Sequence, residues 1–350
     1  MPASKNQAAY LVKAGAALEV RNAPMPTAGP GEIVVKNAAI AINPLDWHIQ
    51  DAGVFVQSWP AIMGSDVAGV VHEVGAGVKR FKEGDRVIGH SVSFVSGRPQ
   101  DGAFALYTVV HSDKAAILPD SIPFTSGVVV PFALEGAVCA LSLKVPGVAL
   151  PGVPTPALGL PYPSLVDLAK SLGKVLVVNG GSSSIGTATT QLAAAAGVTV
   201  ISLVGKDNFK LSKSAGATVV LDHGDPSLVN KVVQAVRDLN QEFLGIFDAI
   251  SIPDTYSSDL AILSQLGGGH LACSHPPPAE VPENVKAGMI FAVNDIATPV
   301  WNDYVTPALE TGKLKCLPPS KIVGKGLGCI QEGLKASKAG VSGIKLVVEL

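Results

Sequence analysis

A glycine- and serine-rich turn is the strongest chemical signal in the sequence. It lies between the apolar, β-branched run Val175–Val178 and an alanine-rich helix that ends near Ala196. Such a turn brings backbone N–H groups up to a pyrophosphate, with the helix N-terminus facing the anion. Gly181, Ser183 and Gly186 fill the slots of G-x-G-x-x-G imperfectly, so a structural turn is the alternative. The strand–helix–strand context favours a dinucleotide site made of Gly180, Gly181, Ser182, Ser183, Ser184, Ile185 and Gly186.

The end of the next strand indicates which dinucleotide is bound. An NAD site usually places Asp or Glu there, to bind the ribose 2′-OH. Here the strand Val198–Val204 is followed by Gly205 and Lys206, with no carboxylate at its own tip. A cation at this place favours the 2′-phosphate of NADPH. The alternative is a solvated Lys206, with Asp207 serving the ribose. We expect NADPH, with Gly205, Lys206 and Asn208 in its site.

The elements around this turn predict a doubly wound parallel sheet. Apolar strands and helices alternate from about residue 174 onward, and such alternation implies parallel strands joined by helical crossovers. The expected strands are Val175–Val178, Val198–Val204, Val219–Leu221 and Ile246–Ile250. The expected helices are Asn208–Ala215, Ser227–Leu239 and Ser257–Leu266, besides the one that ends near Ala196.

The remainder of the chain has a different pattern. Short β segments separated by turns fill the first 130 residues and suggest a barrel-like or sandwich-like β domain. Examples are Ile33–Lys36, Val67–Val74, Arg86–Ile88 and Phe104–Val110. The last fifty residues predict helices at Asp303–Thr311 and Leu327–Ala339 and a strand at Lys345–Val348. The fold class is therefore α/β with a second, β-rich part.

Composition bounds the function further. With 350 residues, 47 % of them hydrophobic and 15 % charged, the chain is large and apolar enough for about two packed cores. The net charge of −2 and the absence of long like-charged runs argue against a nucleic-acid partner. The mean hydropathy of +0.38 invites a membrane hypothesis, but the longest uncharged stretch, Val175–Gly205, is broken by polar residues.

The compartment is predicted from the cysteines and the first residues. The N-terminal residues 1–7 are polar and lack an apolar signal core, and no C-x-x-C occurs. The four cysteines are widely spaced, which argues against a disulfide framework and favours the reducing cytoplasm. They are Cys139, Cys273, Cys316 and Cys329.

Five motifs resemble the medium-chain dehydrogenase/reductase superfamily, and the resemblance covers nearly the whole chain. They are Asn43-Pro44-Leu45-Asp46-Trp47, Gly64-Ser65-Asp66-Val67-Ala68-Gly69, Gly84-Asp85-Arg86-Val87-Ile88-Gly89, Gly181-Ser182-Ser183-Ser184-Ile185-Gly186 and Gly205-Lys206-Asp207-Asn208. Within the superfamily the chain looks most like the zinc-free quinone reductases and the trans-enoyl reductases of fungal secondary metabolism. The resemblance implies a GroES-like catalytic domain formed by residues 1–127 and 300–350. It implies a Rossmann NADP-binding domain at 128–299. Apart from the resemblance, six prolines within residues 145–165 predict a stiff connector between the domains, either a surface linker or a wall or lid over the cleft.

The zinc ligands of the superfamily's alcohol dehydrogenases are missing from the matching positions. Ser65 stands where the histidine ligand would follow Gly64, and residues 41–48 contain no cysteine. Four closely spaced cysteines for a structural zinc are also lacking, so we expect no metal. Alcohol–ketone exchange needs a Lewis acid in these enzymes, whereas reduction of a C=C bond conjugated to a carbonyl does not.

The resemblance also suggests residues for catalysis. We expect hydride transfer from NADPH to the β-carbon of an α,β-unsaturated carbonyl compound, with hydrogen-bond donors meeting the enolate oxygen. Asn43 is expected near the nicotinamide or substrate, and a turn residue before Pro44 is the alternative. Asp46, Trp47 and His48 are expected beside the cofactor, with a structural role for Asp46, holding backbone or an arginine, as its alternative. His48 is the candidate proton donor, although relatives often have tyrosine or lysine there and a packing or ribose-binding role is the alternative. Candidates for the substrate pocket, or equally for core packing, are Trp59, Phe94, Phe132 and Leu134.

The sequence also argues against rival classes of enzyme. No Tyr-x-x-x-Lys or G-x-S-x-G occurs, which argues against a short-chain dehydrogenase and a serine hydrolase. The remaining rival is an NADPH-binding fold used for non-redox cyclisation or isomerisation, or as a binding protein. Leu211 stands where fungal relatives often have a tyrosine near the adenine, so altered adenosine contacts are expected. The expected partner is a small-molecule or carrier-bound unsaturated carbonyl, without nucleic acid or membrane, in a monomer or homodimer.

Overall fold

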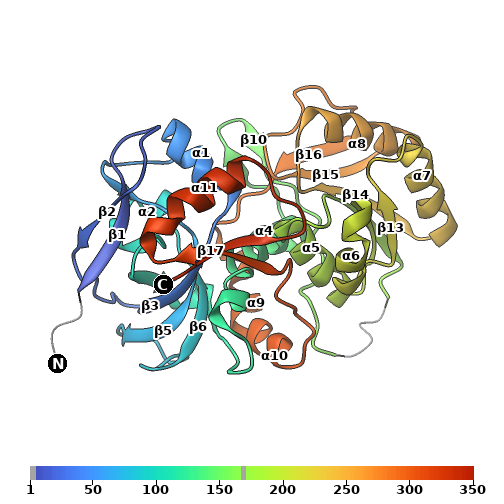
Figure 1. Cartoon of the computed structure of the whole chain (residues 1–350). Coiled ribbons are helices and arrows are strands. Elements are labelled where there is room, and N and C mark those ends of the chain that lie inside the picture. Colours follow the sequence, from blue (N-terminus) through green and yellow to red (C-terminus); the bar gives the residue numbers. More distant parts are fainter. Residues whose placement is uncertain (1–4, 167–170) are drawn as a thin grey trace. The chain divides into compact units, whose positions relative to one another are not determined.

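The chain packs into two compact units in a computed structural model that describes residues 5–166 and 171–350. Unit 1 comprises Met1–Phe132, Trp301–Glu310 and Pro319–Leu350 (Figure 1). Unit 2 comprises Ala133–Val300 and Thr311–Pro318. The helices α4 (Pro131–Ser142) and α9 (Thr298–Asp303) contain two of the points at which the chain passes from one unit to the other.

Unit 1 is built on a seven-stranded sheet. The order is β17-β18-β3-β5-β6-β8, and β7 pairs with residues Glu32–Lys36 of β3. These strands are β3 (Glu32–Ala41), β5 (Asp66–Val74), β6 (Arg86–His90), β7 (Tyr107–His111), β8 (Ala115–Ile117), β17 (Ser320–Lys325) and β18 (Lys345–Glu349). A small sheet of order β2-β1-β4 adds β1 (Asn6–Leu11), β2 (Glu19–Ala23) and β4 (Ala61–Ile62).

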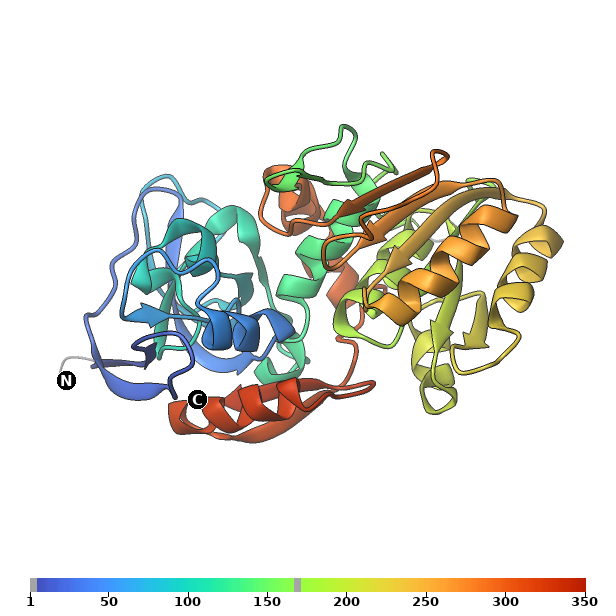
Figure 2. The ribbon, with the colours of Figure 1, turned by 90° about the horizontal axis from the view of Figure 1, so that it is seen from above.

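Both ends of the chain build this unit. The last strand, β18, pairs antiparallel with β3, so that Val348 lies opposite Ile40. Figure 2 shows α11 (Ile330–Lys338) beside the N-terminal elements, where Gln331 accepts a hydrogen bond from the Gln50 amide at 2.8 Å. The other helices are α1 (Pro44–Ala52), α2 (Ser93–Ser96), α3 (Phe124–Gly127) and α10 (Val305–Glu310).

Unit 2 is a six-stranded parallel sheet of order β13-β12-β11-β14-β15-β16, which confirms the doubly wound prediction. Its strands are β11 (Lys174–Asn179), β12 (Thr199–Val204), β13 (Val219–Asp222), β14 (Glu242–Asp248), β15 (Gly269–Cys273) and β16 (Val285–Met289). The crossover helices are α5 (Ser184–Ala195), α6 (Phe209–Ser214), α7 (Leu228–Leu239) and α8 (Pro253–Gln265). Because all six strands are parallel, their carboxyl ends meet at one edge of the sheet.

Several predicted boundaries were wrong for identifiable reasons. The strand expected from Phe104 begins only at Tyr107, because the amide of Phe104 bonds to Met63 and its carbonyl to Ala9 instead of a strand ladder. The strand expected to reach Ile250 ends at Asp248. The Asp248 carboxylate accepts hydrogen bonds from the N–H groups of Ile250 and Ser251, and a turn replaces the end of the strand. The single helix expected at 303–311 is α10, preceded by the separate α9.

The proline-rich segment 145–165 belongs to unit 2. It contains a short hairpin, β9 (Val148–Leu150) with β10 (Val153–Pro154). Its backbone lies against the outer strand β16, since a Cβ placed on Gly288 would come 2.6 Å from the carbonyl oxygen of Pro154. Proline has no N–H to donate, so this segment covers the edge strand without extending the sheet.

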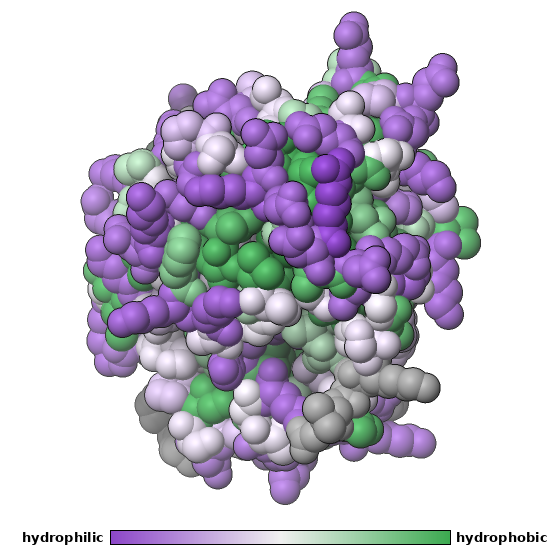
Figure 3. Space-filling view, turned by 90° about the vertical axis from the view of Figure 1, so that its right-hand side faces the viewer, coloured by the Kyte–Doolittle hydropathy of each residue, from purple (hydrophilic) through white to green (hydrophobic). Residues whose placement is uncertain are grey.

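One helical stretch, Phe124–Ser142, is long and apolar enough to cross a membrane by length and composition, and 78 % of it is buried inside the structure. A core helix passes the same test. The face seen in Figure 3 is largely hydrophilic, with an apolar patch near its centre.

Candidate functional site

The glycine-rich turn follows β11 at the carboxyl edge of the unit 2 sheet. Gly180 has a φ of +76°, a conformation that favours glycine. A Cβ on Gly181 would lie 1.9 Å from the hydroxyl oxygen of Ser202, and one on Gly186 would lie 2.3 Å from the carbonyl oxygen of Gly180. The turn therefore requires glycine at all three positions, for its own shape and for the close approach of α5 to the sheet.

Free amide donors gather at this turn. The side chain of Ser183 caps α5 by accepting from the N–H of Gly186 at 3.1 Å. In the part of the chain that the structure describes, the N–H groups of Ser182, Ser184 and Ile185 donate to no acceptor. Such donors at a helix N-terminus match the oxygens of a diphosphate. These residues therefore fit the pyrophosphate of a dinucleotide.

The end of β12 carries a cation and a neighbouring acid. Gly205 precedes a short 3-10 turn, Lys206–Asn208. The Lys206 side chain is 81 % exposed, and its Nζ lies 3.5 Å from Oδ2 of Asp222, the last residue of β13. The sequence interpretation considered only the tip of β12 and missed Asp222, which the adjacent parallel strand brings to the same edge. An exposed lysine there can still meet a phosphate, since the surface ion pair is weak.

Unit 1 holds a buried polar network where α1 begins. Asn43 is the N-cap, and its N–H donates to Asp46 at 2.7 Å. The amide of Asn43 donates to Asp66 at 2.8 Å and accepts from the ammonium of Lys345. Lys345 also lies 3.3 Å from the Asp66 carboxylate, both side chains being almost fully buried. The predicted catalytic Asn43 thus has both its amide atoms engaged within unit 1.

The next two residues of α1 lie in a different environment. Trp47 and His48 are half-buried, and their rings stack with centroids 3.6 Å apart. The Lys338 ammonium lies 5.8 Å from the Trp47 ring. The network at the start of the helix therefore fixes the segment that presents His48, while a direct role for Asn43, Asp46, Trp47 or His48 toward cofactor or substrate stays a prediction.

An apolar hollow lies in unit 1 next to these residues. It is lined by Ile49, Phe55, Met63, Ser65 and Phe94, among others. Trp59 does not line it but is 44 % exposed nearby, where it packs against Gly53.

The other two predicted pocket residues are separate from this hollow. The ring of Phe132 lies 6.5 Å from that of Phe94, at the same side of unit 1. Leu134 lies in unit 2, fully buried in α4.

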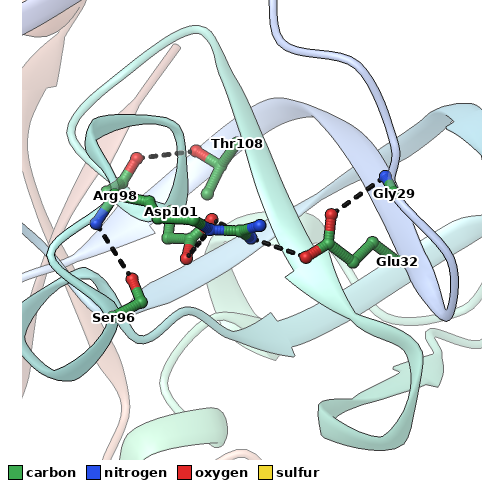
Figure 4. Close-up of polar contacts among 7 residues, drawn as sticks. Gly29, Glu32, Ser96, Arg98, Asp101 and Thr108 are labelled. Atoms are coloured by element: carbon green, nitrogen blue, oxygen red, sulfur yellow. Dashed lines mark hydrogen bonds and ion pairs between the residues drawn. The ribbon is translucent and has the colours of Figure 1, made fainter.

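Arg98 braces the loop that forms one wall of the hollow (Figure 4). Its guanidinium donates to Asp101 at 2.7 and 2.9 Å and to Glu32 at 2.6 Å, and these contacts raise its pKa. Glu32 in turn accepts from the N–H of Gly29 at 2.9 Å. The loop is thereby held to the first residue of β3, which gives the wall a defined position.

The buried Asp46 predicts a pH-dependent stability. Burial raises its pKa to about 7, since no water solvates the charged form. In the unfolded chain the Asp46 carboxyl group ionises near pH 3.8. The free energy of unfolding of the wild type should therefore fall between pH 4 and 7, by about 1.4 kcal/mol per pH unit. Asp46→Asn should therefore match the wild type near pH 4 and exceed it at pH 7. Chemical denaturation at both pH values measures this; an equal difference at both would contradict it.

Two compact units, a GroES-like β part and a parallel Rossmann sheet with a glycine-rich turn, define the class of nucleotide-dependent oxidoreductase folds. Residues 29–120 match the family model "Alcohol dehydrogenase GroES-like domain". The chain is 72 % identical over 345 residues to dehydrogenase orsE of Emericella nidulans, covering 99 % of both. It is 35 % identical over 352 residues to trans-enoyl reductase himH of Aspergillus japonicus, covering 99 % of this chain and 97 % of that one. The chain belongs to the medium-chain dehydrogenase/reductase superfamily.

Solved structures share this fold. An alcohol dehydrogenase superfamily protein from Novosphingobium aromaticivorans superposes with a TM-score of 0.76 at 20 % identity, covering 99 % of both chains. Escherichia coli quinone oxidoreductase, solved in complex with NADPH, gives a TM-score of 0.70 at 18 % identity, covering 98 % of this chain and 100 % of that one. These similarities confirm the predicted fold class.

Within residues 5–166 and 171–350, no three His, Cys, Asp or Glu side chains gather closely enough to hold a metal ion. Ser65 is buried, and its carbonyl accepts from the N–H of Ser91 at 2.8 Å.

Proposed function

We propose that the protein is an NADPH-dependent reductase of C=C bonds conjugated to a carbonyl, acting without zinc in fungal secondary metabolism. The observation that carries the proposal is the turn after β11, with its three free N–H groups, beside the exposed Lys206 at the end of β12. The naming of one relative as a trans-enoyl reductase, and of a structural neighbour as a quinone oxidoreductase in complex with NADPH, supports it.

Each part of the chain has a defined task in this proposal. The N–H groups of Ser182, Ser184 and Ile185 bind the diphosphate, and Lys206 binds the 2′-phosphate. NADPH, when bound, supplies the hydride for the electron-poor carbon. His48, on the helix fixed by the Asn43 network, holds the proton that the α-carbon receives. The aromatic residues Trp59, Phe94 and Phe132 contribute to the apolar surface for the substrate.

The test of the reaction is the consumption of NADPH with a panel of enones and quinones. We expect loss of NADPH absorbance that a zinc chelator leaves unchanged, and a product with one deuterium at the β-carbon when C4-deuterated NADPH is used. NADPH binding without consumption across the panel would favour the non-redox alternative. Loss of turnover upon chelation, with zinc found in the pure protein, would overturn zinc independence.

Replacing His48 with phenylalanine tests the proton donor. We expect kcat to fall about 100-fold or more, as removal of a general acid does, while the affinity for NADPH changes less than about threefold. The control is His111→Phe, which removes a half-exposed histidine at the end of β7. Unchanged turnover of the His48 variant would exclude it from the chemistry.

Replacing Lys206 with glutamate tests the choice of cofactor. Loss of a charge-assisted contact should weaken NADPH binding by about 10- to 100-fold and leave NADH binding within about threefold. Lys286→Glu changes the net charge equally but lies on β16, at the opposite edge of the sheet from β13. Fluorescence titration with both cofactors measures the effect, and equal weakening for NADPH and NADH would contradict the assignment.

A further inference from the structure

Two buried carboxyl groups in unit 2 take no part in the proposed reaction. Asp248 ends β14 and Asp259 lies in the second turn of α8, and both side chains are fully buried. They interact directly, and one oxygen of Asp259, Oδ2, has no hydrogen-bond partner in the described chain when the group is ionised. Two anions in contact without water repel each other strongly, so one of them must carry a proton.

The donors around the pair decide which carboxyl group is the anion. Asp248 accepts from the N–H groups of Ile250 and Ser251, each at 2.8 Å, and from the Thr255 hydroxyl at 2.6 Å. Among the residues that the structure describes, Asp259 accepts an N–H only from the Asn179 amide, at 2.9 Å. Three donors stabilise negative charge on Asp248, so the proton belongs on Asp259, where it can be shared with Asp248.

The pair joins β14 to β11, the strand that leads into the glycine-rich turn. Asn179 is the last residue of β11, directly before Gly180, and it lies opposite Asp248 in the sheet. On the other side, Ile250 packs on the turn itself, because a Cβ on Gly180 would lie 2.6 Å from its Cγ1. Ser251, held by Asp248, adopts a left-handed φ of +57°, which a non-glycine residue keeps only when its surroundings fix it.

We propose that Asp259 is a positioning residue of the nucleotide site: as a neutral carboxyl group it joins Asn179 to Asp248, and so fixes both the start of the glycine-rich turn and the loop after β14 that packs on it. The proposal rests on the proposed binding of NADPH. Besides Asp248, Cys273 of β15 interacts with Asp259, and Tyr256 of α8 interacts with Cys273 and Asp248. Burial raises the pKa of Cys273 to about 12, and that of Tyr256 also lies above its ordinary value. Both therefore stay neutral while Asp259 titrates. Burial and Asp248 raise the pKa of Asp259 well above its ordinary value, in agreement with the geometry.

The experiment compares NADPH affinity, measured by fluorescence titration at pH 7 and pH 9, in matched variants. Asp259→Asn keeps the shape and a neutral donor, Asp259→Ala removes both, and Asp254→Asn changes an exposed carboxylate on the same helix. We expect Asp259→Asn to bind as the wild type at pH 7 and Asp259→Ala to bind about tenfold more weakly, a typical size for coupling between groups. We also expect the NADPH affinity of the wild type to fall as rising pH ionises Asp259 against Asp248, and that of the Asn variant to stay unchanged.

Two results would overturn the inference: an Asp259→Asn variant that binds NADPH as weakly as the Asp259→Ala variant at pH 7, or an Asp259→Ala variant that binds it as strongly as the wild type. Melting curves separate this from a failure of the proposed function, because they need no cofactor. When folding raises the pKa of a carboxyl group, the folded protein becomes less stable as the pH rises above the pKa of that group in the unfolded chain. The melting temperature of the Asn variant should therefore rise relative to that of the wild type between pH 4 and 9. If the Asn variant shows this gain in melting temperature but the wild type binds neither NADPH nor NADH, the proposed function is wrong. The proton shared between Asp259 and Asp248 is then still supported.

Discussion

Replacing Lys345 with methionine is expected to lower the free energy of unfolding by about 3–5 kcal/mol, the usual penalty for leaving a buried charge without its partner. Lys345 lies 3.3 Å from Asp66, and the two side chains are 4 % and 0 % exposed. Methionine fills a similar volume but cannot neutralise Asp66 or donate to Asn43. For a folding unit of about 150–250 residues, this energy corresponds to a fall in melting temperature of roughly 6–20 °C.

A surface pair on the same unit provides the control. Lys338 lies 2.6 Å from Asp51, with both side chains about half exposed, so Lys338→Met should change stability by less than about 1 kcal/mol. Chemical denaturation of both variants measures the difference. Two equally small effects would contradict the expected penalty for burying Asp66 without its cation.

The same lysine shows where prediction from sequence stops. Lys345 opens the apolar strand Lys345–Glu349 and, by alternation alone, is an ordinary charged residue at a strand end. Its partner Asn43 is 302 residues away in the sequence, and only the pairing of β18 with β3 brings them together. Local pattern predicts elements, but contacts of such separation depend on topology.

Asp222 and Asp259 were missed for related reasons. Asp222 belongs to the strand after the one examined for a ribose carboxylate, and the parallel register of β12 and β13 places it beside Lys206. Asp259 reads as an exposed helical residue between Ser258 and Leu260, yet its side chain faces the sheet. Polar residues are assigned to the surface by default, so buried acids escape such an interpretation.

The glycine-rich turn, by contrast, was predictable because its signal is local. A β-branched run, glycines at fixed spacing and a capping serine all lie within fifteen residues, and each has a direct steric or hydrogen-bonding meaning. The apolar pocket residues carry no such signal. Leu134 and Phe94 are both large and apolar, and only the structure separates the buried leucine from the phenylalanine that lines a hollow.

Replacing Gly181 with alanine is expected to weaken NADPH binding by up to about 100-fold, the equivalent of 1–3 kcal/mol of overpacking. The added methyl group would lie 1.9 Å from the hydroxyl of Ser202, which cannot move away because it accepts a 2.6 Å hydrogen bond from Ser212 in a fully buried site. The turn must shift instead, and the N–H groups of Ser182 and Ser184 shift with it. Titration of the variant with NADPH measures the loss.

A second substitution distinguishes this steric cause from a general loss of folding. Ser202→Gly removes the two Ser202 atoms that the new methyl group meets at 1.9 and 3.2 Å and leaves only Val204 Cγ1, at 3.4 Å, so the double variant should regain at least about tenfold in affinity over Gly181→Ala. Gly328→Ala is the neutral control, since its added Cβ meets no atom within 4 Å. If the double variant binds no better than the single one, the position of the turn is set by something other than the contact of Gly181 with β12, and the geometric basis assigned to the diphosphate site is wrong.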